Sequence, residues 1–326
     1  MLKSLPRLTL LGPCFFCSFL LLASSADSTR TTTDRKVETV SSPFQLPRPT
    51  GSYGVGRVSY SLIDRSRPEP LAQTAGAIRE VIVEIWYPAE TRPLKRSDTA
   101  PYLPGFEAAK PKMIQDDIKD LFSPATYSGS LPETHTVENA PIARGNRKFP
   151  LLVFSHGWGN PTFLYTAELE DIASHGYIVA AVDHPYDTAF TQFPDGRIAL
   201  FAQKEFDTAS KQPNGYISYA RQRVEVMAED NRFALTELLR YATIKTLHAP
   251  FFQRVDEMHI GAFGHSIGGL ASARTCQIDN RVKACMDQDS ADDRGSPFIA
   301  TDLKQTEQQP FLLFVAFSRM MPRWRG

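Results

Sequence analysis

The chain has 326 residues, of which 42% are hydrophobic and 22% charged, so it is long enough to bury a sizeable core and too apolar to be a disordered protein. Its 36 basic and 36 acidic residues cancel to a net charge of zero. This balance argues against nucleic acid as a partner, and any contact with a membrane or lipoprotein surface would have to be apolar.

The first 26 residues have the layout of a secretory signal peptide. Lys3 and Arg7 precede an apolar run over residues 8–22, and small residues at 23–26 suit cleavage before Asp27. The alternative is an uncleaved anchor, but a membrane-spanning helix needs about 20 apolar residues, and a glycine and a proline interrupt this run. We therefore expect a secreted protein.

The mature chain is expected to begin with a flexible segment. Residues 27–50 are rich in Ser, Thr, Pro and Arg and carry few apolar groups that could offset the entropy of ordering. Residues 51–326 then form the folded domain. Its first strands are predicted at residues 55–61 and 80–87, where β-branched and aromatic side chains are dense.

Residues 90–148 are rich in proline and predict an irregular surface insertion with a short helix near residues 108–121. After this insertion, strand and helix patterns alternate. Buried strands are predicted at residues 151–154, 177–182, 258–263, 282–286 and 311–317, and helices at residues 163–175, 216–241 and 267–276. This alternation indicates the α/β class, with a mostly parallel sheet flanked by helices.

A nucleophile motif lies between one of these strands and the next helix. Residues 264–268 read G-H-S-I-G, which matches the G-x-S-x-G turn in the strand–turn–helix context that such a turn requires. Gly264 and Gly268 lack side chains that would clash in so tight a turn, and the helix N-terminus adds partial positive charge. A chance match is the alternative. We predict that Ser266 is the catalytic nucleophile.

A serine nucleophile also needs donors for the oxyanion. Residues 156–159 read H-G-W-G and follow the first buried strand of the alternating region, where such a turn supplies a backbone N–H. We assign the two oxyanion donors to the backbone N–H groups of Trp158 and Ile267. The indole of Trp158 is also suited to plain core packing, and His156 and His265 are predicted to be structural.

Together these segments resemble the plasma (isoform II) platelet-activating-factor acetylhydrolase family. The resemblance extends from about residue 50 to about residue 315 and is carried by residues 53–56, 83–88, 149–159, 169–182 and 264–269. It implies an α/β-hydrolase fold and a calcium-independent serine lipase that removes short or oxidised sn-2 acyl groups from phospholipids, with no metal and no cofactor. Residues 183–187, which read D-H-P-Y-D, depart from the mammalian pattern and leave the acyl and head-group preference open.

The resemblance also places the acid of a catalytic triad. In this fold the acid follows the strand after the nucleophile helix, and the family's acid matches Asp289, 23 residues beyond Ser266. Asp287 is the alternative. Asp292 and Asp293 follow in the same loop and are expected to be solvated.

No histidine occupies the position of the base. All seven histidines precede Ser266, whereas the family's histidine follows the strand matched by residues 311–317, and only nine residues remain after that strand. We therefore expect a chain truncated at its C-terminus by a gene-model, frameshift or splicing event. Triad members act as a unit, so most catalysis should be lost. His184 as a relocated base is the alternative.

Two cysteines remain beyond the signal segment that holds Cys14 and Cys17. Cys276 and Cys285 could form one disulfide at most, and two buried free thiols are favoured over a bridge.

Three functional hypotheses remain open. The first is the phospholipid esterase described above, the second a dienelactone-hydrolase-like or polyester esterase, and the third a non-catalytic truncated protein that binds lipid or a protein partner. An apolar cleft would favour the first over the second. The sequence leaves the oligomeric state open.

Overall fold

The computed structural model describes residues 45–91, 99–103, 131–243, 250–290 and 309–314. These residues form a mixed sheet of eight strands in the order β10-β9-β8-β4-β5-β2-β1-β3. The strands are β1 (Gly54–Pro68), β2 (Ile78–Ala89), β3 (Thr136–Glu138), β4 (Phe149–Ser155), β5 (Ile178–Asp183), β8 (Val255–His265), β9 (Val282–Gln288) and β10 (Phe311–Phe314). The run β5-β4-β8-β9-β10 is parallel, and β2 is antiparallel to both β1 and β5.

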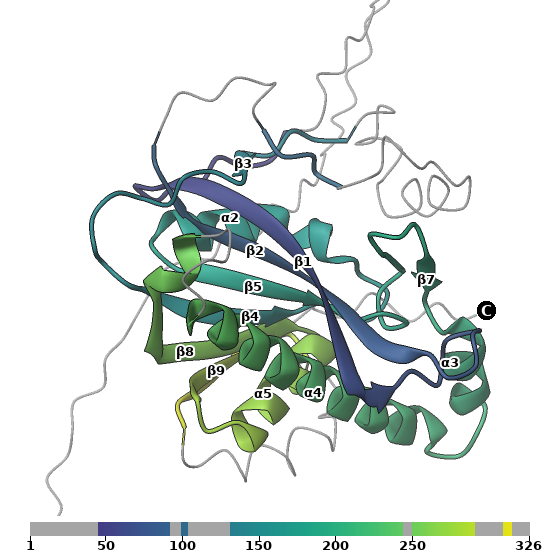
Figure 1. Cartoon of the computed structure of the whole chain (residues 1–326). Coiled ribbons are helices and arrows are strands. Elements are labelled where there is room, and N and C mark those ends of the chain that lie inside the picture. The colour runs from purple at the N-terminus through teal and green to yellow at the C-terminus, as the bar shows by residue number, and fades with distance from the viewer. Residues whose placement is uncertain (1–44, 92–98, 104–130, 244–249, 291–308, 315–326) are drawn as a thin grey trace, which may run out of the picture. The chain divides into compact units, whose positions relative to one another are not determined.

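Four α-helices accompany this sheet: α2 (Thr166–Ser174), α3 (Gln203–Ser210), α4 (Gly215–Thr243) and α5 (Ile267–Ile278). Figure 1 shows α4 and α5 side by side in front of the sheet. The described residues also form two short 3-10 helices, η2 (Thr162–Tyr165) and η3 (Pro250–Arg254), and a separate hairpin of β6 (Phe190–Gln192) and β7 (Ile198–Leu200).

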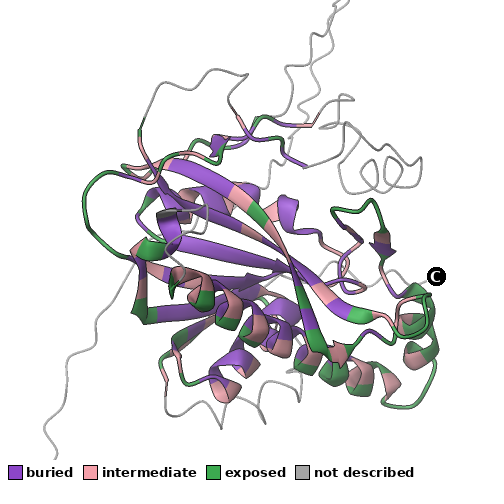
Figure 2. Ribbon diagram, viewed as in Figure 1, coloured by how far each residue is buried: buried purple, intermediate pink, exposed green. Residues whose placement is uncertain are grey.

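Helices cover both faces of the central strands. In β5, Ile178, Ala180 and Val182 belong to the cluster that contains apolar side chains of α4. The alternate residues Val179 and Ala181 pack with side chains of α2. Successive strand residues point to opposite faces, so the sheet is the middle layer of three. Its central strands are almost wholly buried (Figure 2). The structure therefore confirms the predicted α/β class.

Two of the predicted elements occur in the structure, but their ends differ from the predicted ones. The strand expected at residues 55–61 continues to Pro68 as β1 because it pairs along its length with β2. The helix expected at residues 163–175 divides into η2 and α2, and its predicted end at Gly176 is confirmed by a backbone φ of 98° there.

The described part of the insertion at residues 90–148, which the sequence predicts to be irregular, contains a strand. Its residues Thr136–Glu138 form β3, which pairs in parallel with β1. The helix predicted near residues 108–121 lies outside the described residues.

Residues 45–50, at the end of the segment predicted to be flexible, are held against the domain. Leu46 is buried in an apolar cluster with Phe163, and Thr50 donates its backbone N–H to Asp171 at 2.6 Å. The predicted signal peptide lies outside the described residues. Within the part of the chain that the structure describes, no helix is both long enough and apolar enough to cross a bilayer.

The prediction of two free thiols is wrong, because Cys276 and Cys285 form a disulfide in the structure. The crossover from α5 to β9 brings their Cα atoms to 6.3 Å, a separation that a disulfide spans without backbone movement. Spacing in the sequence could not reveal this approach, because it depends on how α5 packs on β9.

Candidate active site

Ser266 occupies the turn between β8 and α5. Its backbone has φ 54° and ψ −126°, a left-handed conformation that costs a non-glycine residue roughly 1–3 kcal/mol. The turn is held by hydrogen bonds from the Ser266 N–H to the Gln288 carbonyl (2.8 Å) and from the Gly269 N–H to the Ser266 carbonyl (2.9 Å). The strained residue is thereby tied to β9 on one side and to its own helix on the other.

Two glycines make this turn sterically feasible. A Cβ atom on Gly264 would lie 2.4 Å from the Gly268 carbonyl oxygen, and one on Gly268 would lie 2.2 Å from the Ser155 carbonyl oxygen. Both neighbours are backbone atoms and cannot rotate away. The sequence-based explanation of these glycines is therefore confirmed, and the nucleophile turn lies in direct contact with the end of β4.

The H-G-W-G loop emerges beside this turn. β4 and β8 are parallel, and Ser155 pairs with Gly264, so the two strands deliver their loops to the same sheet edge. Tyr165 joins the loops, because its hydroxyl accepts the Gly157 N–H at 3.1 Å and contacts His265 Nδ1 at 2.8 Å.

The two residues assigned as oxyanion donors lie in the H-G-W-G loop and directly after Ser266. Trp158 follows Gly157 in the loop, and Ile267 is the first residue of α5. Neither backbone N–H donates to another described residue. The arrangement can therefore present two amides to a developing negative charge.

His265 is directed to Tyr165, which agrees with the structural role expected from the sequence. Burial lowers the pKa of His265, against the charge of Asp289. The Tyr165 oxygen accepts the Gly157 N–H, so its own proton is available to a neutral His265 ring at Nδ1.

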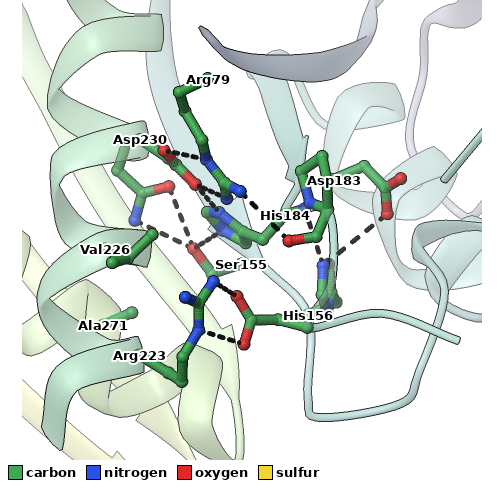
Figure 3. A network of polar contacts seen from close by, with 12 residues as sticks. Arg79, Ser155, His156, Asp183, His184, Arg223, Val226, Asp230 and Ala271 are labelled. Carbon is green, nitrogen blue, oxygen red and sulfur yellow. Dashed lines mark hydrogen bonds and ion pairs between the residues drawn. The ribbon is translucent and has the colours of Figure 1, made fainter. Parts of the chain in front are cut away.

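The hypothesis that His184 acts as a relocated base is wrong. Its ring is fully buried, with Nδ1 2.9 Å from Asp230 and Nε2 3.1 Å from the hydroxyl of Ser155 (Figure 3). Burial lowers the pKa of His184 to about 4, against the hydrogen bond to Asp230, so the ring is neutral. Nδ1–H then donates to Asp230, and Nε2 accepts the Ser155 hydroxyl. Both ring nitrogens are used inside the protein.

The same buried network holds the loop that carries Trp158. His156 is fully buried and accepts the backbone N–H of His184 at 3.0 Å. The remaining nitrogen of His156 contacts the Gly157 carbonyl at 2.9 Å, so the structural role expected for His156 agrees with its contacts. Asn231 on α4 donates to the Ser155 hydroxyl at 2.9 Å.

Asp230 carries the charge of this network. Burial would raise the pKa of its carboxyl, but the field and hydrogen bonds of Arg79 and the hydrogen bond of His184 hold that pKa far below its usual range. Arg79 is itself only 2% exposed and also pairs with Glu69 at 2.5 Å. Arg79 and Asp230 thus form a buried ion pair, which His184 links to Ser155 at the start of the H-G-W-G loop.

His184 contributes a loss of stability on mild acidification, which is opposed over the same range by Asp287, whose raised pKa of about 6 favours the folded state as the pH falls. The folded ring stays neutral down to about pH 4, whereas the ring in the unfolded chain takes up a proton below its ordinary pKa of 6.5. Protons then favour the unfolded state between these values, and stability lost as the pH falls can reach about 3 kcal/mol. Urea unfolding of the wild type and of His184→Gln at pH 7 and pH 5 isolates the contribution of His184, which is the difference between the two pH dependences. His184→Gln should be less stable at pH 7 but less pH-dependent, and equal pH dependence in both proteins would contradict the assignment.

The two candidate acids differ in their surroundings. Asp287 is 1% exposed, and burial raises its pKa to about 6, against hydrogen bonds from Ser290. Its carboxylate lies beneath the start of α5, since a Cβ on Gly269 would approach it to 2.1 Å. Asp289 is exposed beyond β9, with φ 62° and its N–H bonded to the Phe314 carbonyl at 2.7 Å. The two carboxylates thus occupy different places, Asp287 inside the domain and Asp289 at the end of β9, and the assignment of Asp289 as the acid stays a prediction.

No described histidine makes a hydrogen bond to Ser266. Besides the three histidines discussed above, the others with described positions contact carboxylates: His135 with Glu170, His175 with Asp171 and His259 with Asp256. His248, Asp292 and Asp293 lie outside the described residues. Within the described ranges, no group of three or more histidine, cysteine or acidic side chains is placed to hold a metal ion.

Sequence reasoning missed the buried polar network. One signal was available: Arg223 and Asp230 lie seven residues apart on the apolar face of α4, and both are buried. Charged residues at core positions of a helix indicate partners elsewhere in the core. The sequence does not name those partners, which come from β1, β2 and the segment after β5.

Three comparisons with known proteins agree on the kind of protein. Residues 38–317 match the family described as platelet-activating factor acetylhydrolase, isoform II. A probable 1-alkyl-2-acetylglycerophosphocholine esterase of Arthroderma benhamiae is 26% identical over 75% of this chain, and a platelet-activating factor acetylhydrolase of Canis lupus familiaris is 30% identical over 44% of it. The chain spans only 58% and 35% of these two relatives.

A solved structure extends the likeness to three dimensions. A ferulic acid esterase from Streptomyces cinnamoneus superposes with a TM-score of 0.59 and 27% identity, over 83% of this chain and 75% of that one. The α/β-hydrolase fold expected from the sequence is thereby confirmed.

Proposed function

Because the chain belongs to the isoform II family of platelet-activating factor acetylhydrolases, we propose that it is a serine ester hydrolase with Ser266 as its nucleophile. The observation that carries the proposal is the left-handed turn at Ser266, packed against the loop that bears the Trp158 amide. We propose that its substrates are phospholipids with short or oxidised sn-2 acyl groups. We also propose that the protein is secreted and that it contacts lipid surfaces through apolar groups. The two acetylhydrolase relatives support this substrate class.

The reaction follows from the positions of these groups. The Ser266 oxygen attacks the ester carbonyl carbon and gives up its proton. The carbonyl oxygen becomes an oxyanion between the N–H groups of Trp158 and Ile267. Collapse of this intermediate breaks the ester bond, releases the protonated lyso-alcohol and leaves an acyl group on Ser266. Water then hydrolyses the acyl-serine and restores the hydroxyl.

The proton from Ser266 needs an acceptor. Asp289 is proposed to orient a base, but every described histidine ring contacts a group other than Ser266. We therefore propose that this 326-residue polypeptide acylates slowly. A triad that lacks one member keeps only residual catalysis from the oxyanion hole and binding, about 10³–10⁴-fold over water.

The side of the loop next to Trp158 is aromatic. The Trp158 ring lies 5.2 Å from Phe206, 5.8 Å from Tyr216 and 5.9 Å from Tyr219, measured between ring centroids. Tyr216 is 51% exposed. An apolar wall beside the oxyanion donors suits an acyl chain. It also suits an aromatic acyl group, for which the similarity to a ferulic acid esterase is the specific observation.

A fluorophosphonate probe tests the proposal. The 326-residue protein should be labelled slowly at Ser266, and Ser266→Ala should remove the label completely because the substitution removes the reacting hydroxyl. Added imidazole should accelerate labelling of the wild type at least tenfold, since it supplies the base, and should have no effect on Ser266→Ala. Labelling can be followed by mass spectrometry of the peptide that contains residue 266.

Each alternative gives a distinct outcome. Fast labelling that imidazole does not change would show that a base is present, with His248 the first histidine to replace. Absence of label with and without imidazole would favour a non-catalytic binding protein. Preferential turnover of feruloyl or polyester substrates over sn-2 acetyl phospholipids would favour the other esterase hypothesis.

A further inference from the structure

The loop that carries the Trp158 amide is fastened by Asp187. The indole Nε1–H of Trp158 donates to Asp187 Oδ1 at 3.1 Å, and the Gly159 N–H donates to the Asp187 carbonyl at 2.8 Å. One residue thus holds both the side chain of Trp158 and the peptide that follows it. These two contacts together restrict the conformation of the Trp158 backbone.

Asp187 is fixed in turn by Arg223 on α4. Arg223 donates Nε to Oδ1 at 2.8 Å and Nη2 to Oδ2 at 2.6 Å, and the two side chains are 4% and 1% exposed. Burial would lower the pKa of Arg223, but the charge and hydrogen bonds of Asp187 raise it. A bidentate guanidinium–carboxylate pair fixes both position and orientation.

The other end of the loop is held by the same segment after β5. His184 contacts the Ser155 hydroxyl and donates its N–H to His156, and Asp187 lies three residues further on. The loop from Ser155 to Gly159 is therefore held at its start by His184 and at its end by Asp187.

We infer that Asp187 and Arg223 are positioning residues of the oxyanion hole, acting through Trp158. This inference rests on the proposed function. A buried ion pair is weak support for stability, because apolar residues of similar volume often replace it without loss. The contacts to Trp158 and Gly159 give this pair a second role, which is to hold a backbone amide in line with the nucleophile turn.

The test compares Asp187→Ala with Asp187→Asn. Both variants remove the charge that faces Arg223, so their losses of stability should be similar. Only asparagine keeps an oxygen that accepts the Trp158 indole. The limiting rate of fluorophosphonate labelling in imidazole should fall about 100-fold in Asp187→Ala, the size expected when an oxyanion donor is displaced. It should fall no more than about tenfold in Asp187→Asn, with half-saturating probe concentrations within about threefold of wild type.

A matched control is Asp279→Asn. Asp279 is also buried and pairs with an arginine, Arg281, but it caps the end of α5 remote from Ser266. This variant should lose stability and keep the labelling rate of the folded protein. Labelling of Asp187→Ala at the rate of this control, or equal rates in the two Asp187 variants, would overturn the inference.

A second readout separates this inference from the proposed function. The indole N–H signal of Trp158 in a ¹⁵N spectrum should shift, and its hydrogen exchange should accelerate, in Asp187→Ala but not in Asp279→Asn. An unlabelled wild type with this shift intact would reject the esterase proposal and leave the anchoring of Trp158 established. A labelled wild type whose Trp158 signal ignores Asp187→Ala would reject the inference alone.

Discussion

Replacing Asp230 by alanine is expected to lower the free energy of unfolding by about 3–5 kcal/mol, the cost of leaving a buried charge without its partner. Asp230 is fully buried and receives hydrogen bonds from Arg79 (2.5 and 3.1 Å), Arg67 (2.8 Å) and His184 (2.9 Å). Its loss would leave the buried guanidinium of Arg79 with Glu69 as its only carboxylate among the described residues. Urea unfolding followed by circular dichroism measures the change.

Two further variants show whether the uncompensated charge causes the loss. Arg79→Met combined with Asp230→Ala removes both partners and should recover part of the stability lost by Asp230→Ala alone. Asp195→Ala breaks a pair with Arg197 that is exposed on both sides, and it should change stability little because surface pairs contribute little. A double variant less stable than Asp230→Ala would instead point to lost packing volume or to the Glu69 carboxylate left without Arg79.

Gly268→Ala should reduce the rate of fluorophosphonate labelling at Ser266 at least about 100-fold, because a displacement near 1 Å at a reacting centre can cost this much. The added methyl group would lie 2.2 Å from the Ser155 carbonyl oxygen and 2.5 Å from the His156 carbonyl oxygen. Relief requires α5 and the end of β4 to move apart. That movement separates Ile267 from the loop that carries the other oxyanion donor.

Gly261→Ala, on the strand β8 that leads into the turn, is the control. Its methyl group would meet the Leu152 Cδ2 atom at 2.9 Å, which is the end of a flexible side chain, and a carbonyl oxygen only at 3.4 Å. Leu152 can rotate, so labelling should stay within about threefold of wild type. Labelling rates are compared per folded protein, with the folded fraction measured by circular dichroism. Equal rates in the two glycine variants would remove the steric argument for the turn.

The nucleophile turn could be predicted because its causes are local. Gly264, Ser266 and Gly268 lie within five residues, and the strand before them and the helix after them have clear apolar patterns. The same holds for the H-G-W-G loop after β4. The sequence displays the spacing of these glycines directly, although Gly268 also has to clear the distant Ser155 carbonyl and the H-G-W-G loop is held by His184 and Asp187.

The buried network could not be predicted because its causes are distant. Arg79 and Asp230 are 151 positions apart in the sequence, and His184 lies between them. Taken alone, each of these polar residues would be expected at the surface. The same reason applies to the pairing of β3 with β1 and to the disulfide between Cys276 and Cys285. These features depend on which elements pack against each other, and the hydrophobic periodicity of the sequence does not contain that information.

The position of β8 has a consequence for how activity is lost on heating. β8 lies between β4 and β9, inside the parallel part of the sheet, and Ser266 follows it directly. Inner strands open only in the largest cooperative unit of a protein, whereas loops and edges fray at little cost. The turn at Ser266 is therefore protected from partial melting. Heat should disrupt this turn only together with the native sheet.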